Sequence, residues 1–233
     1  SVPVKRKFFR KFLNYFNDAN KEKKNKKFDF SIIGGPHYSS DTKLGLGLVA
    51  AGLYRSDRND TILPPSNVSL YGDVSTVGFY LLGVRGTHLF PYDKYRLNYN
   101  LYFYSFPSLY WGAGYDNGAN SDNESDYDRF QAQMKVDFMF QLARNFYVGP
   151  MAVFDYVYGH DFEKPELWEG MSTRTTNLSV GLSLLYDSRD FLTNAYKGYY
   201  LRIDQRFSPA FLGNKYAFSS TELDTRYYHT IWK

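Results

Sequence analysis

The chain has 233 residues, of which 43% are hydrophobic and 20% aromatic, and its formal net charge is +4. It contains no cysteine, which excludes zinc–thiolate sites, disulfide frameworks and cysteine nucleophiles. No run of about 18 apolar residues occurs, so no transmembrane helix is expected. The 23 tyrosines suit a membrane interface, because a tyrosine ring is apolar along its body and polar at its tip.

The first 27 residues are the most basic part of the chain. Residues 5–27 contain ten lysines and arginines against two acidic residues. Apolar residues at helical spacing predict a short basic amphipathic helix: Phe8, Phe9, Phe12, Leu13 and Phe16. Such a segment suits a solvated leader, a membrane-surface anchor or a plug for a pore. Contact with nucleic acid is not expected, because no nucleic-acid-binding fold follows.

Apolar and polar side chains alternate in segments through the rest of the chain. In residues 96–104 one face carries leucine, tyrosine and phenylalanine, and the other carries mainly arginine and asparagine. Ten segments of this kind predict ten strands: 28–38, 43–54, 66–75, 77–89, 94–105, 128–141, 145–158, 176–187, 198–207 and 216–231. Such ribbons are typical of an all-β, antiparallel up-and-down barrel that crosses an outer membrane. We therefore expect residues 28–233 to form the N-terminal part of a transmembrane β-barrel, with residues 1–27 as its leader.

The connections between these strands differ in length. Residues 106–126 are rich in Gly, Asn, Ser and Asp, and residues 159–175 carry several charges, so both predict long extracellular loops. Residues 91–94 and 142–145 predict tight periplasmic turns. If the first strand runs outward, strand parity places both long loops outside and both short turns inside.

Polar side chains on alternate positions are expected to face the lumen. A charge facing lipid at the membrane midplane costs roughly 2–4 kcal/mol, which excludes the outer face. The predicted lumen-facing residues are Asn98, Asn100, Gln131, Gln133, Lys135, Asp137, Arg202, Asp204, Arg206, Glu222, Asp224 and Arg226. They suit either a structural network of paired charges or a selectivity filter for ions or substrates. On the same face, Gly45 and Gly47 allow the sheet to bend or another group to pack closely against it.

One turn carries a family motif. Residues 181–190 end in Tyr-Asp-Ser-Arg-Asp, and residues 197–201 begin with Lys-Gly-Tyr. Together with Gly34-Gly35-Pro36 in the first strand, these segments resemble the BamA/TamA bacterial surface antigen family. The motif residues are Tyr186, Asp187, Ser188, Arg189, Asp190, Gly198 and Tyr199. The resemblance implies a sixteen-stranded barrel with a weakly paired seam between its first and last strands, and Gly34, Gly35 and Pro36 would weaken that seam.

The chain departs from the family pattern in three ways. The 27 leading residues leave no room for the periplasmic POTRA domains that usually precede the barrel. Ten strands are visible where the family has sixteen, and the last residues lack the usual terminal aromatic, so we expect a truncated barrel. The family's Val-Arg-Gly loop motif is spelled by Val84-Arg85-Gly86, but inside the fourth strand, where we interpret it as coincidence.

The sequence offers no motif for enzymatic chemistry. The four histidines, at positions 37, 88, 160 and 229, have no ligand spacing, so neither a metal nor a cofactor is expected. His160, Asp161 and Ser172 are interpreted as a polar loop cluster rather than a catalytic site. The leading hypothesis is a non-enzymatic barrel that inserts or exports envelope proteins. Its expected partners are the lipid bilayer, lipopolysaccharide and client barrels. A passive channel, an accessory envelope subunit and a soluble sandwich remain the alternatives.

Overall fold

Ten strands account for most of the chain. The computed structural model describes residues 28–56, 63–192 and 194–230, so the amphipathic helix predicted in residues 1–27 lies outside the described residues. The strands are β1 (Phe28–Ser39), β2 (Lys43–Tyr54), β3 (Ser66–Ser75), β4 (Tyr80–Leu89), β5 (Tyr95–Tyr110), β6 (Ser125–Ala143), β7 (Phe146–His160), β8 (Arg174–Asp187), β9 (Gly198–Ser208) and β10 (Phe218–Tyr228). All ten predicted strands are present.

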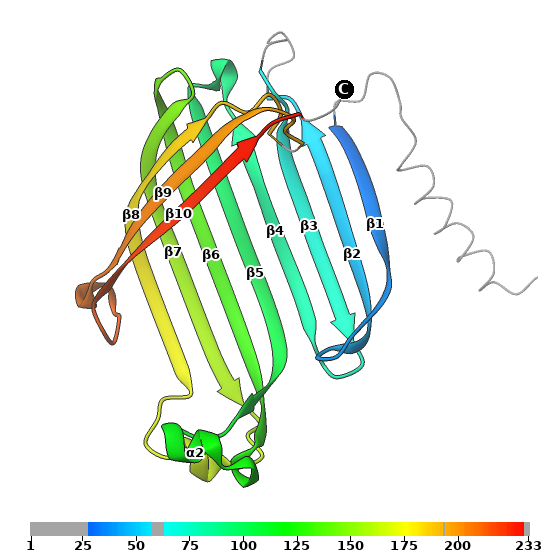
Figure 1. The fold of residues 1–233 in the computed structure, drawn as a ribbon, viewed down its shortest axis with the longest axis vertical. Coiled ribbons are helices and arrows are strands. Elements are labelled where there is room, and N and C mark those ends of the chain that lie inside the picture. Colours follow the sequence, from blue (N-terminus) through cyan, green and yellow to red (C-terminus); the bar gives the residue numbers. More distant parts are fainter. Residues whose placement is uncertain (1–27, 57–62, 193, 231–233) are drawn as a thin grey trace, which may run out of the picture.

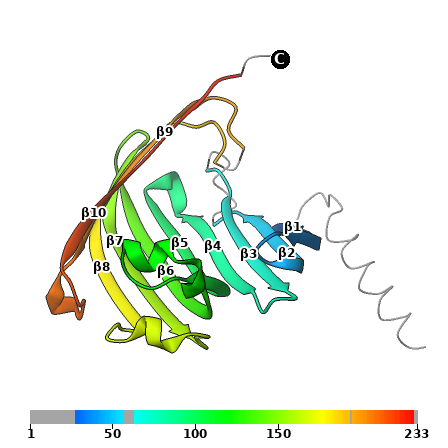
Figure 2. The same ribbon diagram turned by 60° about the horizontal axis from the view of Figure 1, so that its bottom comes forward.

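The strands form one antiparallel sheet in chain order, from β1 to β10 (Figure 1). This confirms the all-β, up-and-down class predicted from the alternation. Figure 2 shows that the sheet curves into a trough, with β1 near one edge and β9 and β10 at the other. Among the described residues, β1 pairs only with β2 and β10 only with β9, so both edges are open. No helix within the described ranges is long and apolar enough to span a membrane.

The convex face of the sheet is apolar. Side chains at alternate positions of several strands are exposed there: Leu44, Leu46, Leu48, Leu70, Leu82, Phe103, Leu182 and Leu201. In water such a surface would be unfavourable, since the free energy of exposing apolar area is about 25 cal/mol per Å². Facing lipid, it is the expected outer surface of a barrel.

Aromatic rings gather at the short-turn end of this convex face. Ring contacts run from Tyr54 on β2 to His88 on β4, then to Phe90, Tyr95 and Phe138. Tyr95 and Phe138 also contact Phe140, and all three rings lie on the lipid-facing side of β5 and β6. This chain of rings matches the aromatic girdle of a membrane interface, where amphipathic rings meet the lipid headgroups.

Two neighbouring residues of β3 provide a direct test of which face meets lipid. Leu70 is 53% exposed on the convex face, whereas Ser69 lines the concave face. Leu70→Arg is expected to lower the free energy of unfolding in lipid vesicles by about 2–4 kcal/mol. The matched variant Ser69→Arg places the same side chain in the lumen and is expected to change it by less than about 1 kcal/mol. Equal losses for both variants would contradict the assignment of faces.

The two ends of the sheet differ as expected from strand parity. The end with short turns holds the 3-10 helix η1 (Pro91–Asp93) and the residues between β6 and β7. The opposite end carries α2 (Tyr115–Ala119), η2 (Ser121–Asn123), η3 (Pro165–Trp168) and η4 (Ala210–Leu212). Figure 1 shows α2 beyond the ends of β5 and β6.

The predicted long loops are shorter than expected. Residues 106–110 continue β5, residues 125–127 open β6, and β7 and β8 extend to His160 and from Arg174. The composition of residues 106–126 indicated a loop, but the ladder between β5 and β6 continues as far as Tyr110 and Ser125. Apolar and polar side chains no longer alternate where a strand leaves the membrane. The sequence pattern therefore does not assign these residues to the strands.

Smaller differences concern β4 and β10. The fourth strand starts at Tyr80 rather than 77, because residues 76–78 form a turn in which Gly78 has a φ of 84°. The last strand spans Phe218–Tyr228 rather than 216–231. Val84-Arg85-Gly86 lies in the middle of β4, paired with β3 and β5, and not in a loop.

Candidate functional site

A polar cavity of about 770 Å³ occupies the concave face of the sheet. Residues of β1 to β6 and of β9 and β10 line it, since the curvature brings the two halves of the sheet to face each other. Nine of the twelve predicted lumen residues are part of this lining: Asn98, Asn100, Lys135, Asp137, Arg202, Asp204, Glu222, Asp224 and Arg226.

Arg202 is the centre of a buried charge network in the cavity wall. Its Nη2 lies 2.7 Å from Oδ2 of Asp137, and its Nε donates to Asp204 at 2.9 Å. Asp137 is 3% exposed and Asp204 1% exposed. Buried carboxylates are stable only when paired and hydrogen-bonded, so Arg202 holds two charges that would otherwise be unfavourable.

Lys135 connects strands that are not neighbours in the sheet. Its Nζ lies 2.7 Å from Asp204 on β9 and 3.3 Å from Glu222 on β10, although Lys135 itself is on β6. These ion pairs bridge the concave side of the curve and fix the distance between β6 and the last two strands. On the other side, Asn98 donates to Asp137 at 2.6 Å and accepts from Thr87, which extends the network to β4.

The remaining predicted lumen residues make local contacts. Gln131 accepts from the Tyr104 hydroxyl, and Gln133 donates to Asp155 on β7. Arg206 donates to the hydroxyl of Ser220 at 3.1 Å and has no ion pair among the described residues. Asp224 pairs with Arg226 on the same strand at 2.6 Å, in an exposed setting.

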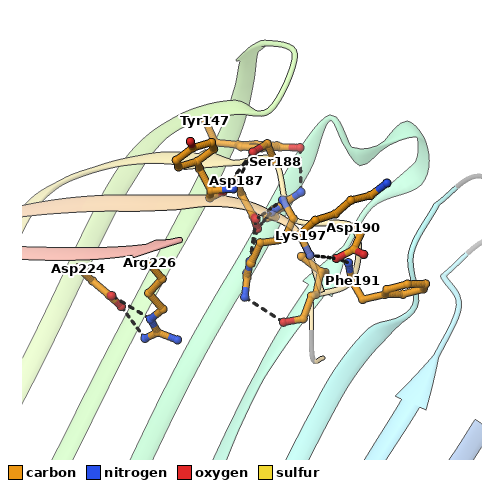
Figure 3. A network of polar contacts seen from close by, with 12 residues as sticks. Tyr147, Asp187, Ser188, Asp190, Phe191, Lys197, Asp224 and Arg226 are labelled. Atoms are coloured by element: carbon orange, nitrogen blue, oxygen red, sulfur yellow. Dashed lines mark hydrogen bonds and ion pairs between the residues drawn. The ribbon is translucent and has the colours of Figure 1, made fainter. Parts of the chain in front are cut away.

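Asp187 of the turn motif is a buried junction between two arginines. It is 5% exposed, its Oδ2 lies 3.1 Å from Nη1 of Arg96, and Arg189 donates to both of its oxygens at 2.8 and 3.0 Å. Figure 3 shows Asp187 and Asp190 in the turn, with Tyr147 beside them. The motif therefore ties the β8–β9 turn to β5, three strands away in the sheet.

Arg96 extends this junction to the turn between β4 and β5. Its Nε and Nη2 donate to the two oxygens of Asp93 at 2.8 and 2.6 Å, a bidentate pair. The Tyr147 hydroxyl donates to Asp93 at 2.6 Å, and the Arg96 guanidinium lies 4.0 Å from the centre of the Tyr147 ring. Beside these polar groups, Tyr147 packs with Met139 and Leu185 in a buried apolar cluster.

Asp190 shapes the turn itself. Its Oδ1 accepts hydrogen bonds from the backbone N–H groups of Phe191, Tyr196 and Lys197 at 3.0 to 3.3 Å. Burial raises the pKa of the Asp190 carboxyl, but these backbone hydrogen bonds outweigh it and hold the pKa below its ordinary value. Gly198 follows with a φ of 121°, a conformation that favours glycine.

The other motif residues complete the turn. The backbone N–H of Ser188 donates to the Tyr199 carbonyl at 2.9 Å, and the Tyr199 N–H donates to the Ser188 hydroxyl at 2.9 Å. Tyr186 is partly exposed on the convex face. The motif is thus a hydrogen-bonded turn with one buried acid, Asp187, that reaches the lumen.

The predicted seam residues lie in the edge strand β1. Gly34, Gly35 and Pro36 pair with Leu48, Gly47 and Leu46 of β2. The ladder to β2 continues through them, although Pro36 has no backbone donor and the two glycines present no side chain, which are features that weaken strand pairing.

Sequence reasoning missed the roles of Asp93 and Tyr147. Asp93 is in a predicted tight turn and Tyr147 is one of 23 tyrosines, so neither stands out. An available signal was the spacing of Asp93 and Arg96, which suits a salt bridge within a turn. The partnership with Asp187, 91 residues from Arg96, has no local signal.

Three metal-binding side chains meet at the outer end of β6 and β7. Asp128 and His160 are cross-strand partners, and donor atoms of both lie within 4.8 Å of those of Asp161. The Nδ1 atom of His160 is hydrogen-bonded to Oδ2 of Asp161 at 2.8 Å, and the Asp161 side chain is 79% exposed. Two carboxylates and an imidazole could ligate a divalent ion, but the same contacts are typical of a polar loop end.

Two comparisons place these observations among known proteins. A family model described as the Omp85 superfamily domain matches residues 87–233. The matched part includes the turn motif and the Arg202 network. A search of curated proteins finds no match to the chain.

Proposed function

The chain belongs to the Omp85 superfamily, and from this premise we propose that it acts in the bacterial outer membrane to insert or export envelope proteins. The proposal assigns it the BamA/TamA type of activity, without enzymatic chemistry and without a cofactor. Its partners would be the lipid bilayer with its lipopolysaccharide and unfolded client barrels.

The composition of β1, which lies at one edge of the ten-stranded sheet, is the observation that carries this proposal. An edge strand presents unpaired backbone N–H and C=O groups, to which another extended chain can add by β-augmentation. Gly34, Gly35 and Pro36 would weaken the pairing of this strand with the last strand of the closed barrel, which would make an exchange of partners at that seam easier. The lipid-facing convex surface would pass the new strand directly into the membrane.

Disulfide cross-linking tests the proposal. The full-length protein with Ser31→Cys, reconstituted in lipid vesicles, is mixed with an unfolded outer-membrane barrel that carries single cysteines along its last strand. We expect cross-links between the Ser31→Cys variant and the client during insertion. The matched variant Ser69→Cys changes a residue of the interior strand β3 that also lines the cavity, so it is expected to give none.

Equal cross-linking at both positions would indicate non-specific capture and would refute a role for the edge. Absence of any cross-link, together with client insertion no faster than in empty vesicles, would refute the proposed function as a whole.

The mixed-charge cavity favours a passive channel as the second candidate. Arg85 lines the cavity, contacts the Tyr71 ring at 5.2 Å and has no ion pair within the described ranges. If the protein is a channel, Arg85→Gln should shift the ion selectivity measured in planar bilayers toward cations. A barrel that does not conduct would count against this candidate. An accessory structural role is the third candidate, and stable co-purification with an envelope complex from native membranes would favour it.

A further inference from the structure

One side-chain contact skips a strand near the open edge of the sheet. His37 of β1 places its Nε2 3.0 Å from both carboxylate oxygens of Asp73, which lies on β3. The strand between them is β2, and the two residues are 36 positions apart in the sequence. An imidazole N–H can donate to a carboxylate in the neutral and in the protonated form, so the contact does not depend on one charge state.

Two glycines of β2 make this contact possible. A Cβ atom on Gly45 would lie 2.5 Å from the His37 ring, and one on Gly47 would lie 2.8 Å from Oδ2 of Asp73. A side chain at Gly45 would force the imidazole to shift, and one at Gly47 would force the carboxylate to shift. Neither glycine has a positive φ, so the space above the strand, and not a turn, accounts for their presence.

The contact lies at the outer end of β1. His37 directly follows Gly34, Gly35 and Pro36, and the strand ends two residues later at Ser39. The Ser39 hydroxyl accepts from the Thr42 backbone N–H at 3.0 Å, which holds the turn into β2. Residues 31–36 contain no charged side chain that could be tied to β3 in the same way, and the next charged residue toward the periplasmic end is Asp29.

We propose that His37 and Asp73 form a clamp that fixes the outer end of β1 to β3, so that the seam opens from the periplasmic end. Gly34, Gly35 and Pro36 are the hinge between the clamped and the releasable part of the strand. His37 and Asp73 are thus positioning residues, which determine how far along β1 an incoming strand can pair. The directional part of this proposal rests on the proposed function, whereas the clamp itself does not.

Hydrogen exchange tests the clamp without any client. His37→Ala and Asp73→Ala are each expected to speed exchange about tenfold, in the reconstituted protein, at whichever of the Tyr38 and Ser39 amides is bonded to β2. The double variant should exchange no faster than either single variant, because both remove the same contact. Gly47→Ala should speed exchange in the same direction, because its Cβ would crowd Oδ2 of Asp73 while both partners are kept. Asp155→Ala removes the acceptor of the Gln133 side chain on the distant strand β7 and should leave β1 unchanged.

Cross-linking then tests the direction of opening. In the otherwise wild-type protein, Ser31→Cys should capture the client strand and Tyr38→Cys should not. Adding His37→Ala should allow capture at both positions. A wild-type background that captures equally at both positions would overturn the directional role, and unchanged exchange at Tyr38 and Ser39 in the clamp variants would overturn the clamp. If the clamp variants loosen β1 but no variant captures a client, the proposed function fails and the clamp stands.

Discussion

Asp187→Asn is expected to lower the free energy of unfolding by about 3 kcal/mol, near the lower limit of the roughly 3–5 kcal/mol typical for breaking a buried ion pair. The carboxylate of Asp187 is 5% exposed and is shared by Arg96 and Arg189. An amide has the same shape but neither the charge nor the second strong acceptor. The loss stays near the lower limit because Arg96 keeps its bidentate partner Asp93.

Urea unfolding in lipid vesicles, followed by tryptophan fluorescence, measures this effect. Asp224→Asn is the matched control, since it makes the same chemical change in an ion pair with Arg226 that is largely exposed. Exposed pairs contribute about 0–1 kcal/mol, so this control should unfold nearly as the wild type does. If Asp187→Asn and Asp224→Asn were equally mild, the turn motif would not be a structural junction.

Much of the fold could be predicted from local sequence. Alternation in residues 96–104 assigns each side chain to a face, because consecutive side chains of a strand point in opposite directions. Strand parity then places the turns at 91–94 and 142–145 at the same end. No long-range information is needed for either step, which is why all ten strands were found.

The extent of the strands and the contacts across the lumen could not be predicted in this way. Residues 106–110 have a loop-like composition, and their pairing with β6 depends on the ladder already formed by residues 95–105. The ion pair of Lys135 with Glu222 joins residues 87 positions apart, and it exists only because the sheet curves. Alternation gives the face of a residue but not the curvature of the sheet, so the charged residues were assigned to the lumen without their partners.

The glycines of β2 illustrate the same limit. Small residues at Gly45 and Gly47 indicated either a bend or close packing against the inner wall, and the sequence could not decide between them. The structure shows close packing, because the His37 ring and the Asp73 carboxylate lie over these positions. The residues that pack against these glycines lie on β1 and β3. They are therefore outside the local sequence around Gly45 and Gly47.

Arg202→Met is expected to be the most destabilising change in the lumen, with a loss of about 4 kcal/mol in the free energy of unfolding, because it leaves two buried carboxylates without their shared cation. Among the residues that the structure describes, Asp137 keeps the Asn98 amide alone, and Asp204 keeps Lys135.

The matched variant Arg206→Met makes the same replacement on β9, four residues further along the same face of the strand. Arg206 donates to the neutral hydroxyl of Ser220, so a loss of about 1 kcal/mol is expected there. Adding Asp137→Asn to Arg202→Met removes one of the two unpaired carboxylate charges and should recover about half of the loss in the free energy of unfolding. If the two sites were independent, the losses of the two substitutions would instead add. Equal losses for Arg202→Met and Arg206→Met would mean that the cavity wall tolerates unpaired carboxylates. The lumen would then be hydrated enough for ions to pass. That result would favour the passive channel over the proposed role in inserting envelope proteins.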